Sequence, residues 1–239
     1  MANFDDNPDP YEREFNGVSR YKPISDKHPG LLRVDFVSKK HTGYFYYVME
    51  LGDALEPGWE RQPSTYKPRD LVNERAHAHG RRLPVRECVQ IGLELTDALD
   101  FLHRQGLTHR DIKPQNVIFV NGRPKLADLG LIAEIRPPDR ERTSVGTPGY
   151  MPPPPERPGS PQADIYALGM VLYVLSTGRK AAFFPEIATT LVENKDPEEF
   201  FPLNSIVLKA CQPDLAQRYA SAIEMHRALQ EAHELLERK

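Results

Sequence analysis

The sequence predicts an α+β fold with two unequal parts, a small β-containing part followed by a larger, mainly helical part. Residues 44–51 are rich in aromatic and β-branched side chains, which predicts a strand in the first part. An Asn-Gly pair at 121–122, flanked by apolar residues, predicts a hairpin. In residues 84–105 apolar side chains recur at helical spacing, which predicts an amphipathic helix. With 239 residues, of which 39% are hydrophobic, the chain can form one globular domain with a sizeable core.

Charge and composition exclude several classes of partner. The net charge of −3 gives no reason to expect nucleic acid or an anionic membrane surface as a partner. No apolar run approaches the roughly 20 residues that span a bilayer, and the acidic, polar N-terminus is unlike a signal peptide. Cys88 and Cys211 lie in helix-like segments and predict free core thiols in a reducing compartment. We therefore expect a cytoplasmic protein, and the sequence leaves its oligomeric state open.

The first part of the chain predicts a tail, one helix and two strands. Residues 1–10 form an acidic segment that contains proline, and residues 11–18 predict the start of a helix. The breaking sequence His28-Pro29-Gly30 follows. Residues 31–37 then predict a short strand, and residues 44–51 predict a buried strand whose aromatic side chains belong to the core.

The second part predicts a polar insertion followed by helices. Residues 53–83 form the insertion, with a short helix expected to start within residues 66–71. His77-Ala78-His79 lies in this insertion without a nearby cysteine, so we interpret it as a solvated loop and not as a metal site. Three further helices are predicted at residues 84–105, 164–175 and 222–236, and the first two end at Gly106 and Gly178.

The Asn121-Gly122 turn fixes which residues face each other across the hairpin. If the turn has two residues, Val120 pairs with Arg123, and counting outward places Asn116 opposite Ala127. Asn116 and Asp128 then lie together at the open end, because cross-strand neighbours are within roughly 4.5–8 Å.

These polar residues suit a particular chemistry. The oxygen atoms of Asn116 and Asp128 form a hard donor set suited to Mg²⁺ that a nucleotide brings, with water and phosphate as further ligands. Asp111 lies five residues before Asn116, in the loop that leads into the same end of the hairpin. A carboxylate there can accept a proton from an incoming hydroxyl group.

The same residues resemble a known family. The segment His109-Arg110-Asp111-Ile112-Lys113-Pro114-Gln115-Asn116 resembles the catalytic loop of protein kinases, and Asp128-Leu129-Gly130 resembles their metal-binding Asp-Phe-Gly. The resemblance implies a protein-kinase-like fold, with a mainly helical large lobe and a partial small lobe. It makes Asp111 the catalytic base or orienting group, and it has Lys113 neutralise charge on the transferred phosphoryl group. It makes Asn116 and Asp128 the ligands of Mg²⁺.

The resemblance also implies a nucleotide pocket. Met49 would guard the back of the pocket, and Glu50, Leu51 and Gly52 would present backbone groups to the adenine. Ile118 is assigned to the same pocket. Glu14, with Glu12 as its rival, would be the helix glutamate that pairs with a nucleotide-positioning lysine. The alternative for Glu14 is an exposed residue on an amphipathic helix.

Residues 128–156 resemble the activation segment of the family. Gly146-Thr147-Pro148-Gly149-Tyr150-Met151 is similar to a substrate-docking loop, with Thr147 hydrogen bonding toward Asp111 and Lys113. Lys113 at its position implies serine or threonine substrates. A phosphate on Thr143 or Ser144, after Arg140, would pair with Arg110, and a neighbouring carboxylate is the alternative partner. The usual Ala-Pro-Glu is replaced by Pro154-Pro155-Glu156 after two further prolines, which makes this stretch stiff and extended.

Two further polar residues receive structural roles. The resemblance makes Asp164 the buried carboxylate that anchors the catalytic-loop backbone, although a helix cap is the alternative. Arg218 resembles the arginine that pairs with the equivalent of Glu156 in a site protected from water.

Two elements that the family uses for nucleotide phosphates are missing from the sequence. No Gly-x-Gly occurs in it, and no Val-Ala-Ile-Lys-like segment precedes Glu14, while Lys22 and Lys27 follow the first helix. The resemblance covers about residues 11–236 and lacks the first three strands of the small lobe. We expect either a chain truncated at its start or a degenerate kinase. The predicted domains are a tail, a small-lobe remnant and a large lobe, at residues 1–10, 11–51 and 52–239.

The resemblance implies an ATP- and Mg²⁺-dependent serine/threonine kinase that acts on protein substrates, with motifs similar to bacterial members. The first alternative is a catalytically inactive, pseudokinase-like binding module, because the phosphate-binding elements are missing. The second is a small-molecule phosphotransferase, which shares an aspartate and an asparagine at this spacing. Residues 146–150 disfavour the second alternative, because such an enzyme has no need of a peptide-docking loop.

Overall fold

The computed structural model describes residues 10–39, 44–77, 82–128, 132–134, 146–154, 156, 159–187 and 197–238. Several residues singled out in the sequence lie outside these ranges: Ala78, His79, Leu129, Gly130, Arg140, Thr143, Ser144 and Pro155. The elements follow in the order α1 (Pro10–Tyr21), η1 (Lys22–Ile24), β1 (Val34–Val37), β2 (Tyr47–Met49), η2 (Trp59–Arg61), η3 (Pro63–Thr65), α2 (Leu71–His77), α3 (Val85–Arg104), β3 (Leu107–Thr108), η5 (Pro114–Asn116), β4 (Val117–Val120), β5 (Arg123–Leu126), β6 (Ala133–Glu134), α4 (Pro161–Thr177), η7 (Ala181–Phe183), α6 (Pro197–Ala210) and α7 (Ala222–Glu237).

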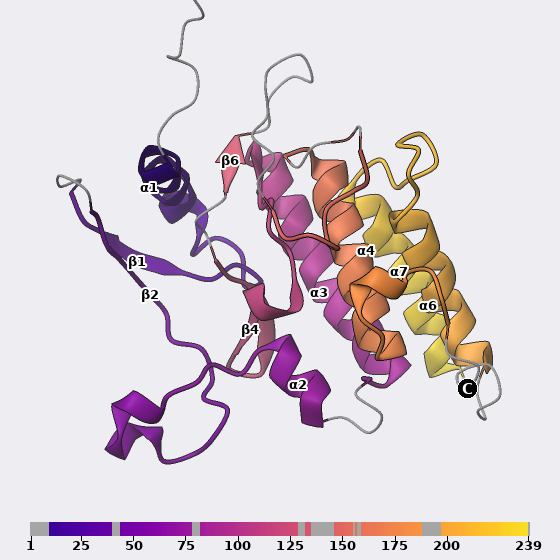
Figure 1. Cartoon of the computed structure of the whole chain (residues 1–239), viewed down its shortest axis with the longest axis horizontal. Coiled ribbons are helices and arrows are strands. Elements are labelled where there is room, and N and C mark those ends of the chain that lie inside the picture. The colour runs from indigo at the N-terminus through magenta and orange to yellow at the C-terminus, as the bar shows by residue number, and fades with distance from the viewer. Residues whose placement is uncertain are drawn as a thin grey trace, which may run out of the picture.

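The molecule has the kinase-like α+β architecture, with a partial small lobe and a helical large lobe. Figure 1 shows α1 and the β1–β2 ribbon on one side and helices α3, α4, α6 and α7 on the other. In the part of the chain that the structure describes, the strands form three two-stranded antiparallel sheets, in the pairs β1–β2, β3–β6 and β4–β5. The boundaries of the predicted domains at residues 10/11 and 51/52 stay predictions.

Helix α4 forms the centre of the helical core. Every residue from Ala163 to Thr177 is buried, because the sequence is apolar on all sides of the helix. The Ser160 side chain accepts a hydrogen bond from the Ala163 N–H, and Gly178 ends the helix at a φ of 72°. Neither α4 nor any other described helix combines the length and apolarity needed to cross a membrane.

Helix α3 carries the chain into the loop before the hairpin. Its predicted apolar stripe is confirmed as the buried face, which includes Cys88, Ile91, Leu95, Leu99 and Leu102. Cys88 and Cys211 are both free and buried, as predicted, and burial raises the pKa of each thiol. The C-terminal helix is also confirmed, whereas helix α6, which contains a proline, was not predicted.

The hairpin has the predicted register. Val120 pairs with Arg123 and Val117 with Leu126, and the turn residues Asn121 and Gly122 have φ values of 53° and 75°. Positive φ at both turn positions is the geometry that matches the twist of antiparallel strands. The carboxylate of Asp53 accepts hydrogen bonds from both turn N–H groups, at 2.7 and 2.8 Å.

The prediction of a buried strand at residues 44–51 was wrong in its burial. The strand is limited to β2, and five apolar residues in this stretch are between 45% and 59% exposed: Tyr44, Tyr46, Val48, Met49 and Leu51. The physical reason is that the β1–β2 sheet has two strands within the described residues, and α1 packs on one of its faces. The rings of Tyr11 and Phe15 contact Phe45 on that face, at centroid distances of 5.7 and 5.3 Å.

The contact between α4 and α6 allows a test of this core. A Cβ atom at Gly169 would lie 2.7 Å from the Cys211 sulfur and 2.8 Å from the Ala210 Cβ. We expect Gly169→Val to lower the free energy of unfolding by about 2–3 kcal/mol through overpacking. Urea unfolding at neutral pH measures this change. Ser205→Val, at an exposed position of α6, should change it by less than about 0.5 kcal/mol, and equal stabilities for the two variants would contradict this packing.

Candidate functional site

A loop between β3 and β4 carries the predicted catalytic residues, and Asp164 holds its start. The backbone N–H groups of His109 and Arg110 each donate to the Asp164 carboxylate at 2.8 Å, and His103 Nε2 lies 2.9 Å from it. Arg110 has a φ of 75°, which costs free energy for a residue with a side chain. Because Ser160 caps α4, the helix-cap alternative for Asp164 is wrong, and the carboxylate anchors the loop.

Burial and hydrogen bonds shift the pKa values of Asp164 and His109. Burial acts to raise the pKa of Asp164, but the hydrogen bonds from His103 and from the Arg110 N–H hold it below its usual range. For His109, burial lowers the pKa, so the ring is neutral. Its Nε2 donates to the Ala127 carbonyl at 3.0 Å, which ties the loop to the residue before Asp128.

Asp111 lies at the centre of a hydrogen-bond cluster. Its Oδ2 accepts from Lys113 Nζ at 2.6 Å and from Asn116 Nδ2 at 2.9 Å, and its Oδ1 accepts from Thr147 Oγ1 at 2.7 Å. Burial acts to raise the pKa of Asp111, but these donors and the Lys113 charge hold it below its usual range. The carboxylate is therefore ionised and fixed in orientation.

Thr147 comes from the distant segment that resembles a docking loop. Besides its bond to Asp111, its hydroxyl accepts a hydrogen bond from Lys113 Nζ at 3.0 Å. The contacts that the resemblance implied for Thr147 are thus present, and they join residues 34 and 36 positions apart in the sequence.

Asn116 and Asp128 meet at the open end of the hairpin, as the turn predicted. Asn116 Nδ2 lies 3.3 Å from Asp128 Oδ2, and the Ala127 N–H donates to the Asn116 carbonyl at 2.8 Å. Asp128 is exposed and has a φ of 60°. The amide oxygen of Asn116 and the Asp128 carboxylate are hard oxygen donors, so these residues fit a Mg²⁺ ion. That role stays a prediction.

The residues assigned to the nucleotide pocket lie between β2 and the hairpin. Ile118 is buried, and a Cβ atom on Gly52 would lie 3.2 Å from its Cδ1. Met49 ends β2 and is half exposed, and Leu51 follows with its side chain in solvent. Ile118 belongs to a small apolar cluster with Ala127, the residue before Asp128.

The Glu50 side chain faces the hairpin. It pairs with Lys125 at 2.5 Å and accepts from the Arg33 N–H at 2.8 Å. Within the described part of the chain, no hydrogen bond occupies the Glu50 carbonyl or the Gly52 N–H. These two backbone groups are therefore available to a ligand, whereas the Gly52 carbonyl already accepts from the Tyr66 hydroxyl at 3.1 Å.

Glu14 lies on α1 and interacts electrostatically with Asp128. Burial and then the charge of Asp128 raise the pKa of Glu14, and burial, Glu14 and Asp128 raise the pKa of Tyr47. The charges of Glu14 and Asp128 therefore both act on Tyr47 of β2. Among the described residues no lysine or arginine forms an ion pair with Glu14.

A buried ion pair lies just after residues 146–151, the stretch that resembles a docking loop. The Arg218 guanidinium is fully buried and lies 2.9 Å from the Glu156 carboxylate. It also donates to the backbone carbonyls of Gln162 and Gln212. The pairing that the resemblance implied is confirmed.

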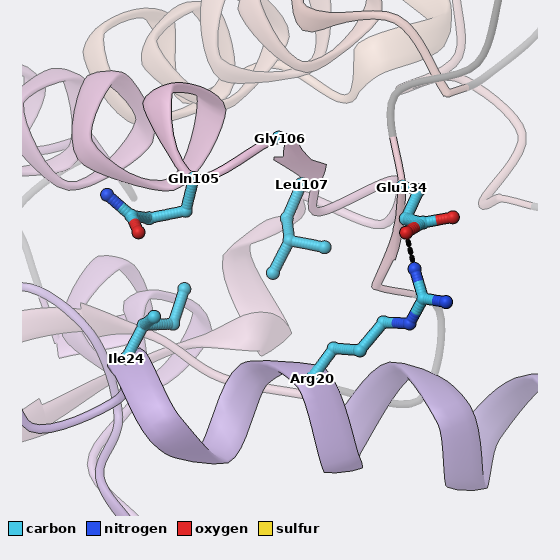
Figure 2. A pocket seen from close by; sticks show the side chains of 6 residues that line it. All are labelled: Arg20, Ile24, Gln105, Gly106, Leu107 and Glu134. Carbon is cyan, nitrogen blue, oxygen red and sulfur yellow. Dashed lines mark ion pairs between the residues drawn. The ribbon is translucent and has the colours of Figure 1, made fainter.

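A separate pocket of about 380 Å³ lies between α1 and the strands β3 and β6. Figure 2 shows Arg20 and Glu134 forming an ion pair at its edge. Its other lining residues are Ile24, Gln105, Gly106 and Leu107. No predicted site residue lines this pocket, so it is distinct from the candidate site.

Sequence reasoning missed several residues that support the site. They are His103, the ring of His109, Ala127, Lys125 and Asp53. Helical and strand spacing identifies buried apolar positions but not the partners of polar ones. For Lys125 the available signal was a charged residue close to the hairpin turn, and for His103 it was a histidine in the last helical turn before the loop. Asp53 lies 68 positions from Asn121, so no local signal marks it.

Comparison with known proteins gives a consistent result. Residues 30–234 match the family described as "Protein kinase domain". CBL-interacting protein kinase 4 of Oryza sativa subsp. japonica is 33% identical over 159 residues, which are 64% of this chain and 32% of that protein. Probable serine/threonine-protein kinase PknB of Lactococcus lactis subsp. lactis (strain IL1403) is 31% identical over 214 residues, 83% of this chain and 31% of that protein.

A third relative is serine/threonine-protein kinase PknG of Mycobacterium leprae (strain TN), 33% identical over 211 residues, which are 83% of this chain and 24% of that protein. The chain thus spans about a third or less of the length of these curated relatives. Helix α1 lies before the start of the family match at residue 30.

The anchoring role of Asp164 generates a test. Asp164→Asn removes the charge and turns an amide toward two N–H donors, so we expect it to lower the free energy of unfolding by about 3 kcal/mol at pH 7. Because the native pKa of Asp164 lies below its unfolded value of about 3.9, its ionisation stabilises the fold above about pH 4. This contribution is lost as the pH falls through the native pKa.

Urea unfolding from pH 7 to pH 3 measures both effects. The unmodified chain should lose more stability than Asp164→Asn below pH 4. Asp97→Asn, which changes an exposed carboxylate near His28, is the matched control and should have little effect. The anchoring role would be contradicted by an Asp164→Asn variant as stable as the control.

Proposed function

Because the chain belongs to the protein kinase family, we propose that it transfers the γ-phosphoryl group of ATP to serine or threonine hydroxyl groups of proteins. The observation that supports this proposal best is the hydrogen-bond cluster of Asp111, Lys113, Asn116 and Thr147, with Asp128 beside it. Three of these residues come from one loop, and the other two come from the segment that follows the hairpin.

Asp111 acts on the attacking hydroxyl group. Its ionised carboxylate accepts the hydroxyl proton while the new bond from oxygen to the γ-phosphorus forms and the bond to the bridging oxygen of ATP breaks. Thr147 and Asn116 hold the carboxylate in one orientation. Lys113 is placed to stabilise negative charge on the transferred group, since its ammonium lies beside both Asp111 and Thr147.

Asn116 and Asp128 are the residues that would hold Mg²⁺. The ion, when bound, neutralises charge on the nucleotide phosphates. The adenine is proposed to bind the Glu50 carbonyl and the Gly52 N–H, beside Met49, Leu51 and Ile118. The absence of described hydrogen bonds to those two backbone groups supports this assignment.

A specific observation favours a second candidate function, a catalytically inactive binding module. The sequence contains no Gly-x-Gly, and Glu14 has no cationic partner in the described part of the chain. In that case the chain would act through its surface, and the intact polar cluster would serve only to hold the loop. Nucleotide binding and phosphoryl transfer separate the two candidates.

Nucleotide binding is the first test. At about 100 times its dissociation constant, Mg²⁺-ATP should stabilise the chain by about 2.7 kcal/mol, which raises Tm by about 5–10 °C at this chain length. Differential scanning fluorimetry measures the shift. Asp128→Ala should abolish the magnesium-dependent part of it, whereas Asp26→Ala, at an exposed aspartate of the N-terminal part, should not. If the unmodified chain shows no shift, the chain is not a catalyst on its own.

Phosphoryl transfer is the second test. Asp111→Asn should keep the nucleotide-induced shift but lower kcat with a serine- or threonine-containing protein substrate by about 10²–10⁴-fold. Radiolabelled transfer from ATP measures kcat, with Asp26→Asn as the matched control. If phosphate passes to an aminoglycoside-like molecule and to no protein, the small-molecule alternative replaces the proposal. An unchanged kcat would remove Asp111 from its proposed role.

A further inference from the structure

Residues 55–67, between β2 and α2, form a compact loop whose two ends are held together. The Leu55 N–H donates to the Lys67 carbonyl at 2.9 Å, and Ala54 pairs with Pro68 in an isolated antiparallel bridge. The loop contains η2 and η3, and Figure 1 shows it projecting away from the helical part of the molecule. Compact surface loops whose ends lie close together frequently carry function.

The base of this loop is tied to the hairpin strand β4. The Asp53 N–H donates to the Phe119 carbonyl at 2.7 Å, and the Phe119 N–H donates to the Arg69 carbonyl at 2.9 Å. The Arg69 N–H in turn donates to the Asp53 carbonyl at 2.7 Å. The chain on both sides of the loop is therefore fixed to the strand that carries Ile118.

Tyr66 reaches from the loop to the proposed adenine site. Its ring packs against Trp59 at a centroid distance of 5.1 Å, and its hydroxyl donates to the Gly52 carbonyl at 3.1 Å. Burial, and then the charge of Asp53, raise the pKa of Tyr66, so the hydroxyl keeps its proton at neutral pH. A Cβ atom on Gly52 would lie 3.3 Å from the Tyr66 hydroxyl oxygen, so a glycine at this position allows the close approach.

The position of this hydroxyl matters for the edge of the purine base. Along that edge of adenine the amino group at C6, the ring nitrogen N1 and the C–H at C2 follow one another. In the proposed function the first two bind the Glu50 carbonyl and the Gly52 N–H, so C2 faces the next backbone group, the Gly52 carbonyl. Guanine carries a donor amino group at C2, and the acceptor that such a donor needs is the carbonyl that Tyr66 already occupies.

We propose that Tyr66 is a specificity-determining residue of the nucleotide site, which selects adenine over purines that carry a 2-amino group. The inference rests on the proposed function, from which it takes the position of the adenine. A 2-amino group has to displace the Tyr66 hydroxyl or lie beside it without an acceptor, and a buried donor without an acceptor is costly. The C–H group of adenine at C2 meets neither cost.

Comparison of ATP with 2-aminoadenosine triphosphate tests the proposal on the unmodified chain. The two nucleotides share the groups at C6 and N1 and differ only at C2. With Mg²⁺ present, we expect the 2-amino nucleotide to bind about tenfold more weakly, because the net contribution of about one hydrogen bond is lost. Isothermal titration calorimetry on the full chain measures both dissociation constants. GTP, which also differs at C6 and N1, should bind more weakly still.

A variant of Tyr66 locates the selectivity. Tyr66→Phe removes the hydroxyl and keeps the ring beside Trp59. The Gly52 carbonyl is then open to the 2-amino group, so the dissociation constant of the 2-amino nucleotide relative to that of ATP should fall about tenfold. Tyr46→Phe, at an exposed tyrosine just before β2, is the matched control and should leave this ratio unchanged. Because both nucleotides are compared on the same protein, the ratio does not depend on the stability of a variant.

Two results would overturn the proposal while leaving the proposed function in place, since ATP itself would still bind. The first is equal affinity of the unmodified chain for ATP and the 2-amino nucleotide. The second is a ratio that stays the same or rises in Tyr66→Phe, which would mean that the hydroxyl does not oppose the 2-amino group. If neither nucleotide binds the unmodified chain, the adenine site fails, and the proposed function falls together with this inference.

Discussion

The buried carboxylate of Asp164 is the constraint on which the rest of the site depends. A buried charge is costly unless it is paired, and here two backbone N–H groups and His103 lie within 2.9 Å of it. Hydrogen bonds to a charged group contribute about 1.5–3 kcal/mol each, which offsets the positive φ of Arg110. Asp164 belongs to α4, which is buried along its length. Packing of the helical core therefore fixes the loop geometry that aims Asp111.

The pKa values of the carboxyl groups shift in opposite directions at the two ends of the site. At one end Asp111 is compensated by Lys113, and its pKa lies below the usual range. At the other end Asp128 and Glu14 act on each other, and the pKa of Glu14 is raised. A cation close to Glu14 would lower this pKa.

The parts of the structure that the sequence predicted are those that local chemistry determines. Asn121-Gly122 permits positive φ at two consecutive positions, so the turn fixed the register and brought Asn116 to Asp128. The apolar stripe of α3 and the all-round apolar pattern of α4 likewise need only their own sequences. The burial of residues 44–51 was predicted wrongly because strand composition does not say how many strands a sheet has. Glu50 and Asp53 bind partners about 70 positions away, which no local pattern reveals.

The two parts of the molecule differ in whether their polar and apolar groups have partners within the described residues. In the helical part the buried charges discussed here have partners: Asp164 contacts backbone N–H groups, Arg218 contacts Glu156, and Asp111 contacts Lys113. In the small part, the apolar side chains of Val48 and Met49 on β2 are exposed, and the outer edge of β2 and the carboxylate of Glu14 lack partners within the described residues. Within the described residues, the helical part satisfies the buried charges discussed here internally, whereas the small part leaves backbone, apolar and ionic groups open beside one strand.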